Sequence, residues 1–186
     1  GPLTVVLQRS DRVGDWVTGG QDTVAVRVPE HPVAHQILAA FGGAVAAPSA
    51  NRFGQVSPTS AAHVRRDLAG LLDADTDVIV DGGECQVGVE STIVDATGPA
   101  PVILRPGRFS AADVAEMAGV EVAAATTSAP RVSGSLGAHY SPRARVRVLE
   151  AVPPTGTPGC GLIAAAILAT PVGTVRLMAP DDSSDY

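Results

Sequence analysis

Short strand-like runs alternate with helix-like segments along most of this chain, and that order narrows the choice of fold more than any other property. Leu3–Gln8 is a compact apolar run, and residues 23–28 alternate polar and apolar side chains with the period of a β-strand. Pro32–Phe41 then carries apolar residues at helical spacing and stops at Gly42-Gly43, as a helix with proline in its first turn does. The sequence therefore predicts an α/β domain.

The alternation continues through residue 123. We expect a second helix over residues 61–72 and a third that begins at Ser110, where Asp113 completes a capping box, and runs to about Ala118. Further strands are expected at residues 78–80, 91–95, 101–105 and 120–123, with Thr97-Gly98-Pro99 turning the second of these into the third.

A polar turn at residues 46–58 is the first place where chemistry is expected. It follows an apolar, strand-like run at 43–47 and precedes a helix, and ligands in α/β sheets collect beyond the carboxyl ends of strands. Ser49, Asn51 and Ser57 place two hydroxyls and one carboxamide on this turn. The alternative is a polar loop whose side chains only satisfy their own backbone.

Charge and cysteine content exclude several classes of protein. The net charge is -6, and the thirteen basic residues are all arginine, so a broad basic face for nucleic acid is not expected. Cys85 and Cys160 match no metal-ligand spacing and fit a reducing compartment. No run approaches the roughly 20 apolar residues of a membrane span.

The composition changes after the last predicted strand of the first domain. Residues 124–145 are rich in Ser, Thr, Gly, Pro and Ala and read as a linker. Residues 146–186 then carry strand-like runs at 146–149, 160–164 and 174–178, which predict part of a small α/β domain. The expected organisation is thus a domain at 1–123, a linker at 124–145 and a partial domain at 146–186.

Three motifs stand in order along the first domain: Asp-Thr-Val-Ala-Val-Arg-Val-Pro, Pro-Ser-Ala-Asn and Gly-Val-Glu-Ser-Thr-Ile-Val-Asp. Together they resemble the YrdC-like family of threonylcarbamoyl-adenylate synthases, and the resemblance runs from residue 1 to about residue 142. It implies a twisted mixed sheet with flanking helices. The tail resembles the small Rossmann-like domain of the two-domain branch of that family.

The resemblance also implies a reaction. L-threonine, bicarbonate and ATP would give threonylcarbamoyl-AMP and pyrophosphate, for the threonylcarbamoyladenosine modification of tRNA next to the anticodon. The triphosphate implies Mg²⁺, and the threonine carbamate, which is labile in water, implies a lid that excludes solvent. A cytoplasmic protein is expected, with a downstream tRNA threonylcarbamoyl transfer machinery and at most weak contact with RNA.

Family positions assign candidate binding residues without any covalent nucleophile or metal ligand. Those that match ATP-contacting positions are Thr23, Ser49, Asn51, Ser57, Arg105 and Tyr140. Those that match L-threonine-contacting positions are Arg27, Ala47 and Ser91. Arg27 also suits this role chemically, because a guanidinium forms a bidentate pair with a carboxylate.

One departure from the family and two rival functions stand beside this interpretation. Family members carry a preceding segment with Lys and Arg residues for the triphosphate, so we expect this chain to be an internal piece of a longer protein. One rival is a carbamoyl-adenylate-forming carbamoyltransferase of the same fold. The other is a non-catalytic RNA-binding module, which the acidic charge disfavours.

Overall fold

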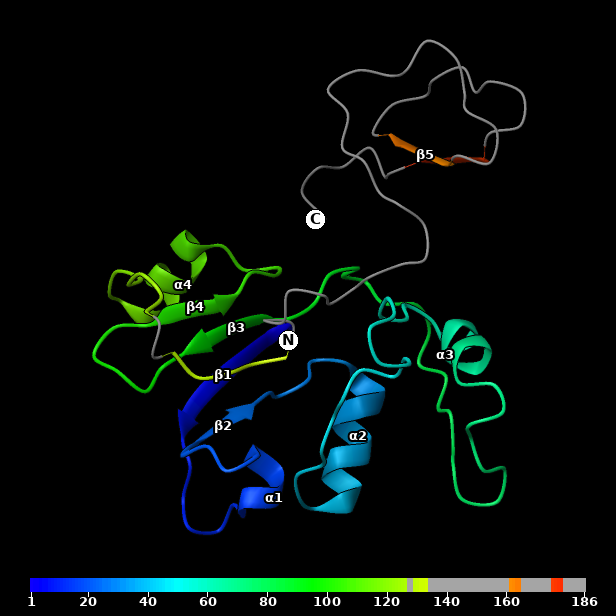
Figure 1. The fold of residues 1–186 in the computed structure, drawn as a ribbon, viewed down its shortest axis with the longest axis horizontal. Coiled ribbons are helices and arrows are strands. Elements are labelled where there is room, and N and C mark those ends of the chain that lie inside the picture. The colour runs from blue at the N-terminus through cyan, green and yellow to red at the C-terminus, as the bar shows by residue number, and fades with distance from the viewer. Residues whose placement is uncertain (127–128, 134–160, 165–174, 179–186) are drawn as a thin grey trace. The chain divides into compact units, whose positions relative to one another are not determined.

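The computed structural model describes residues 1–126, 129–133, 161–164 and 175–178. The chain divides into two compact units, Gly1–Pro142 and Arg143–Tyr186. The first unit contains four strands and four helices among its described residues (Figure 1): β1 Leu3–Gln8, α1 Asp15–Thr18, β2 Thr23–Val26, α2 Pro32–Phe41, α3 Ala61–Asp67, β3 Thr92–Asp95, β4 Val102–Arg105 and α4 Ala111–Ala118.

The four strands form one mixed sheet in the order β2-β1-β3-β4. β1 runs antiparallel to β2 and parallel to β3, and β3 runs antiparallel to β4. The β3–β4 pair is the predicted hairpin. This architecture confirms the expected α/β class with a mixed sheet and flanking helices.

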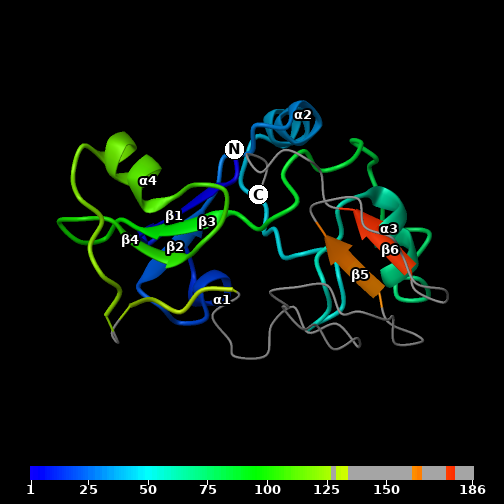
Figure 2. The same cartoon turned by 90° about the horizontal axis from the view of Figure 1, so that it is seen from above.

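The core lies between this sheet and α4, which Figure 2 shows beside it. Leu3, Val5 and Val94 line a small apolar hollow together with Val114 and Met117 of α4. Val94 and Val114 are buried there. The aliphatic side chains of alternate strand positions thus meet one helix stripe, as the predicted strand and helix periods require.

The capping box predicted for α4 is confirmed. Ser110 Oγ accepts from the Asp113 amide at 3.3 Å, and Asp113 Oδ2 accepts from the Ser110 amide at 2.7 Å. Hydrogen bonding from the Ser110 side chain, and then from its backbone, lowers the pKa of Asp113 below its ordinary value of 3.8. The helix ends at Gly119, whose φ of 69° is a left-handed cap.

The helix at Pro32–Phe41 is also confirmed, whereas the next helix is shorter than predicted. α3 ends at Asp67 instead of residue 72, and Ser60 caps its start through Oγ to the His63 amide at 3.3 Å. Arg52 donates to the Asp67 and Ala69 carbonyls at 2.9 and 3.3 Å. These bonds satisfy carbonyls that a continuing helix would have used internally.

Three predicted strands are wrong, and a fourth is shorter than expected. Residues 43–47 and 78–80 have no strand structure, and residues 120–123 contribute only one bridge, from Ala123 to Val102. Val45 and Val78 are 51% and 83% exposed, so these runs lack the neighbouring strand that would take up their backbone hydrogen bonds. β2 stops at Val26, which places Arg27 just beyond the strand.

The second unit contains a parallel pair among its described residues. β5 Gly161–Ala164 pairs with β6 Val175–Met178, with Gly161 opposite Val175. Both strands are confirmed within a residue of their predicted starts, while the predicted strand at 146–149 lies outside the described residues. No helix in the described part of the chain has the length and apolarity needed to cross a membrane.

Candidate functional site

Arg105 is the centre of a polar cluster at the end of β4. Its Nη2 donates to the Ser91 carbonyl at 2.8 Å and to Ser91 Oγ at 2.9 Å, and its Nε donates to the same carbonyl at 3.1 Å. The hairpin register explains the meeting, because Arg105 pairs with Ile93 near the start of β3. The structure therefore brings together two of the predicted residues, one assigned to ATP and one to L-threonine.

Glu90 adds an acidic group to the cluster and ties in a third predicted residue. Its Oε2 lies 3.6 Å from Arg105 Nη2, and its Oε1 accepts from Ser57 Oγ at 2.5 Å. The Arg105 and Glu90 side chains are 13% and 31% exposed, so water screens this pair less than a surface pair. Ser57 comes from the polar turn, which the cluster thereby joins to the sheet.

Thr4 of β1 completes the cluster from the other side. Its Oγ1 is 2.8 Å from Ser91 Oγ, and Ser91 is only 6% exposed. The two hydroxyls carry two protons and share one hydrogen bond, while Arg105 already donates to Ser91 Oγ. One hydroxyl proton of this pair therefore stays available to an acceptor such as a carboxylate.

The backbone around Ser91 is held by a close approach at Gly107. A Cβ on Gly107 would lie 2.4 Å from both the Glu90 carbonyl oxygen and the Thr92 amide nitrogen, so only glycine fits without a shift. Buried Thr92 fixes the following loop, because its Oγ1 accepts from the Phe109 amide at 2.8 Å and donates to the Phe109 carbonyl at 3.1 Å. The Arg-Pro-Gly turn thus packs directly under the cluster.

Arg27 lies near this end of the sheet, whereas Thr23 does not. Val26 pairs with Val5, so the antiparallel register continues to place Arg27 opposite Thr4. Thr23 instead pairs with Gln8 at the far end of β1, about 13 Å from Thr4 at about 3.3 Å per residue. Arg27 is exposed, which leaves its guanidinium accessible.

The rest of the polar turn stands apart from the cluster. Ala47 and Ser49 are exposed, with no helix or strand around them. Asn51 uses Nδ2 within its own loop, donating to the Arg52 and Gln55 carbonyls at 2.9 and 3.2 Å. Its Oδ1 is buried and has no hydrogen-bond partner in the part of the chain that the structure describes. In this conformation Asn51 supports the loop.

The described part of the predicted linker reaches the same cluster. Arg105 Nη1 donates to the Ser133 carbonyl at 3.1 Å. Farther along the sheet, Gln21 accepts from the Arg131 amide at 2.9 Å and donates to the Arg131 carbonyl at 3.3 Å. Tyr140 lies outside the described residues. Among the residues described, no three His, Cys, Asp or Glu side chains gather to hold a metal ion.

Glu90, Thr4 and Gly107 are the cluster residues that the sequence analysis did not select. The predicted hairpin contained a signal for Glu90. In an antiparallel hairpin the end of the second strand lies beside the start of the first, so Arg105 at the end of β4 lies close to the residues just before β3. Thr4 had no such signal. Its contact depends on the parallel pairing of β1 with β3, and strand order is not readable from local patterns.

Comparisons with known proteins agree with this architecture. The family model Sua5_yciO_yrdC, described as "Telomere recombination", matches residues 1–107. A Pyrococcus abyssi protein named threonylcarbamoyl-AMP synthase is 41% identical over 155 residues, which are 81% of this chain and 44% of the relative. One of the same name from Schizosaccharomyces pombe is 41% identical over 160 residues, 78% of this chain and 38% of the relative.

A solved structure extends the likeness to the fold. The crystal structure of P. abyssi Sua5 complexed with L-threonine matches with a TM-score of 0.77 and 31% identity, covering 100% of this chain and 58% of that one. The chain spans less than half the length of the two relatives above. It belongs to the Sua5/YciO/YrdC family.

Proposed function

We propose that the protein containing this chain is an L-threonylcarbamoyladenylate synthase, a nucleotidyltransferase. It would join the amino group of L-threonine to bicarbonate, with loss of water, to give a carbamate. A carbamate oxygen would then attack the α-phosphorus of ATP and displace pyrophosphate. The cluster of Arg105, Ser91 and Glu90 carries the proposal, because it sits in a chain similar to proteins named threonylcarbamoyl-AMP synthase.

Arg105 is proposed to bind ATP. A guanidinium held by the Ser91 carbonyl keeps a fixed direction, and a fixed cation next to a transferring phosphate stabilises the charge that develops there. Ser57 is placed beside it through Glu90. We keep Thr23, Ser49, Asn51 and Tyr140 as proposed ATP contacts on the family pattern.

Arg27 and Ser91 are proposed to bind L-threonine, with Ala47. The register sets Arg27 opposite Thr4, whose hydroxyl meets that of Ser91. A guanidinium and a spare hydroxyl proton are both donors suited to the α-carboxylate of an amino acid. That P. abyssi Sua5 has been crystallised with L-threonine supports this choice of substrate.

Other parts of the proposal concern groups beyond the cluster. Mg²⁺ would arrive on the phosphates of ATP, since the described residues offer no carboxylate set for it. Residues 124–145 are proposed as a lid that excludes water, and residues 146–186 as part of a small second domain. We further propose a cytoplasmic enzyme that hands its product to the tRNA threonylcarbamoyl transfer machinery.

Pyrophosphate release from the complete protein tests the function. With ATP, bicarbonate and Mg²⁺, we expect release only after L-threonine is added, and Arg27→Ala should raise the threonine requirement while leaving that for ATP nearly unchanged. Release driven by carbamoyl phosphate without threonine would contradict the proposal in favour of the carbamoyltransferase. RNA binding without any release of pyrophosphate would favour the binding module.

A further inference from the structure

Glu90 holds two of the proposed nucleotide contacts with separate oxygen atoms. Oε1 accepts the hydroxyl proton of Ser57 at 2.5 Å, and Oε2 lies 3.6 Å from Nη2 of Arg105. One side chain thus fixes a residue of the polar turn and the arginine at the end of β4. The inference drawn from this arrangement rests on the proposed use of ATP.

The hydrogen bond to Glu90 sets what Ser57 can do with a ligand. A serine hydroxyl has one proton and two lone pairs, and an ionised carboxylate can only accept. With its proton committed to Glu90, Ser57 can meet a ligand only as an acceptor. Phosphate oxygens are acceptors too, so they cannot partner Ser57 while this bond is made.

We infer that Glu90 is a positioning residue that turns Ser57 into a hydrogen-bond acceptor for the nucleoside part of ATP. The donors in that part are the two ribose hydroxyls and the adenine amino group. Arg105 lies on the other oxygen of Glu90. Its Nε and Nη2 already donate to Ser91, so the second N–H of Nη1, beside the one given to the Ser133 carbonyl, is the donor left for the phosphates. The cluster would then accept a hydrogen bond from the nucleoside part of ATP through Ser57 and donate a hydrogen bond to the phosphates through Arg105.

The backbone of Glu90 is closely packed, as a positioning role requires. A Cβ added to Gly107 would lie only 2.4 Å from the backbone carbonyl oxygen of Glu90. The turn after β4 therefore packs tightly against the Glu90 backbone. The adjacent residue, Ser91, is buried and holds Arg105 through three hydrogen bonds. The carboxylate is therefore presented from a closely packed backbone just before β3.

Glu90→Gln and Ser57→Ala change this arrangement in different ways. The glutamine has the shape of glutamate but no charge, and its amide group can donate to Ser57 and free the serine proton. The alanine removes the acceptor altogether. Glu84→Gln is the matched control, because Glu84 is an exposed glutamate in the same irregular segment and lies outside the cluster.

Calorimetric titration of the complete protein tests the inference, with ATP, 2′-deoxy-ATP, 3′-deoxy-ATP and purine riboside triphosphate as ligands. Each analogue lacks one donor, so the analogue that binds wild type weakly identifies the group that Ser57 meets. We expect a loss of about fivefold for that analogue, the value of one ordinary hydrogen bond. The preference should vanish in Ser57→Ala, shrink in Glu90→Gln and persist in Glu84→Gln.

Other outcomes would overturn the inference. If Ser57→Ala weakened ATP and all three analogues equally but left adenosine unaffected, Ser57 would be a phosphate donor. A loss that appeared only in the presence of Mg²⁺ would place a cation at Ser57. If Glu90→Gln kept the wild-type preference, Glu90 would have no positioning role. Thermal melting of each variant checks folding, and Ser57→Ala tests the acceptor role even if Glu90→Gln unfolds.

Binding and turnover separate this inference from the proposed function. A protein that showed the analogue preference but released no pyrophosphate with threonine would contradict the function alone. One that released pyrophosphate with threonine but bound the analogues and ATP equally would contradict the inference alone.

Discussion

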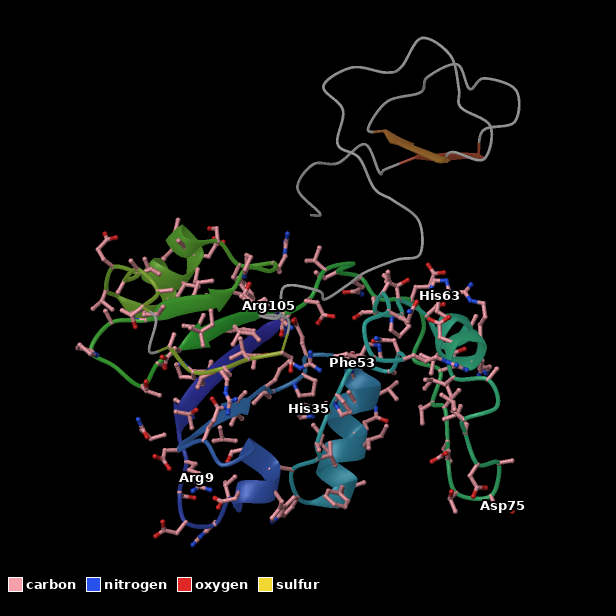
Figure 3. All side chains as sticks on the ribbon, in the orientation of Figure 1. Arg9, His35, Phe53, His63, Asp75 and Arg105 are labelled. Atoms are coloured by element: carbon pink, nitrogen blue, oxygen red, sulfur yellow. The ribbon has the colours of Figure 1, made fainter. Side chains whose placement is uncertain are left out.

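The two ends of the central sheet each carry an arginine, and their surroundings differ (Figure 3). Arg9, just after β1, pairs with Asp15 and with Asp22 at 3.6 Å, and these carboxylates are 76% and 92% exposed. Arg105 is itself more buried and is held by a backbone carbonyl, a hydroxyl and a half-buried glutamate. Exposed ion pairs contribute little to the free energy of folding, whereas removing one partner from a shielded pair leaves the other charge without compensation, which is costly.

This contrast separates an arginine that supports a turn from one that we propose binds a ligand. Arg9 donates to the Val13 carbonyl at 3.2 Å and so closes the turn between β1 and α1. Arg105 joins β4, the start of β3, the polar turn through Glu90, and Ser133. Among the described residues, the side-chain partners of Arg9 lie between residues 13 and 22, whereas those of Arg105 come from segments far apart in sequence.

Removing Arg105 should have the largest effect. In the complete protein, we expect Arg105→Ala to weaken the binding of ATP by about 2 to 4 kcal/mol, because both the proposed phosphate contact and the partner of Glu90 are lost. The binding of L-threonine should weaken less, because it is affected only through the disturbed Ser91 side chain. Calorimetric titration with each ligand measures both losses, and equal losses for ATP and threonine would show that the roles are wrongly assigned.

Gly107→Ala should have the next largest effect, and on stability. The new Cβ would meet the Glu90 and Thr92 backbone at 2.4 Å, and forcing such an overlap costs about 1 to 3 kcal/mol. Gly98→Ala is the matched control, since its Cβ would approach only the Ala100 carbonyl oxygen, at 3.9 Å. Chemical denaturation compares the two variants, and equal midpoints would mean that the turn is not packed as described.

Arg9→Ala should change little. Its partners are exposed, and pairs of that kind contribute about 0.2 to 1 kcal/mol. We expect a small fall in the melting temperature that shrinks further in high salt, with ATP affinity within about twofold of wild type. A loss of ATP affinity in Arg9→Ala as large as that in Arg105→Ala would remove the distinction between the two ends of the sheet.

The smallest effect concerns pH and the cap of α4. The pKa of Asp113 is lowered in the fold by Ser110, so its stabilising contribution is present above the unfolded pKa and is lost as pH falls through the folded one. Thermal melts of wild type and Asp113→Asn should therefore differ at neutral pH, begin to converge as the pH falls below 3.8, and meet only below the lower pKa of the folded state. A difference that stayed constant across this range would contradict the assigned cause.

Local patterns predicted the elements whose signals are local. β1, α2 and the capping box of α4 each carry their own periodicity, proline or cap residues, and all were confirmed. The runs at 43–47 and 78–80 are apolar enough for strands but lack a partner strand. Strand formation depends on that partner, which a short apolar run does not reveal.

The candidate site was predictable in part for the same reason. Arg105 and Ser91 were selected through family motifs, and the predicted hairpin brought them together. Glu90 lies within the Gly-Val-Glu-Ser motif, but its hydrogen bond with Ser57 depends on where the fold places the polar turn. The contact of Thr4 with Ser91 depends in the same way on the pairing of β1 with β3.

Hydrogen exchange of the complete protein, with and without ATP and L-threonine, tests the central claim most directly. We expect ligands to slow amide exchange around residues 57, 90–92 and 103–107, at the Arg105 end of the sheet, because bound ligands suppress local opening there. Exchange around residues 10–18, in the turn and α1 at the Arg9 end, should stay unchanged. Protection of residues 10–18 without protection of 90–92 would place the ligands at the wrong end of the sheet and contradict the account.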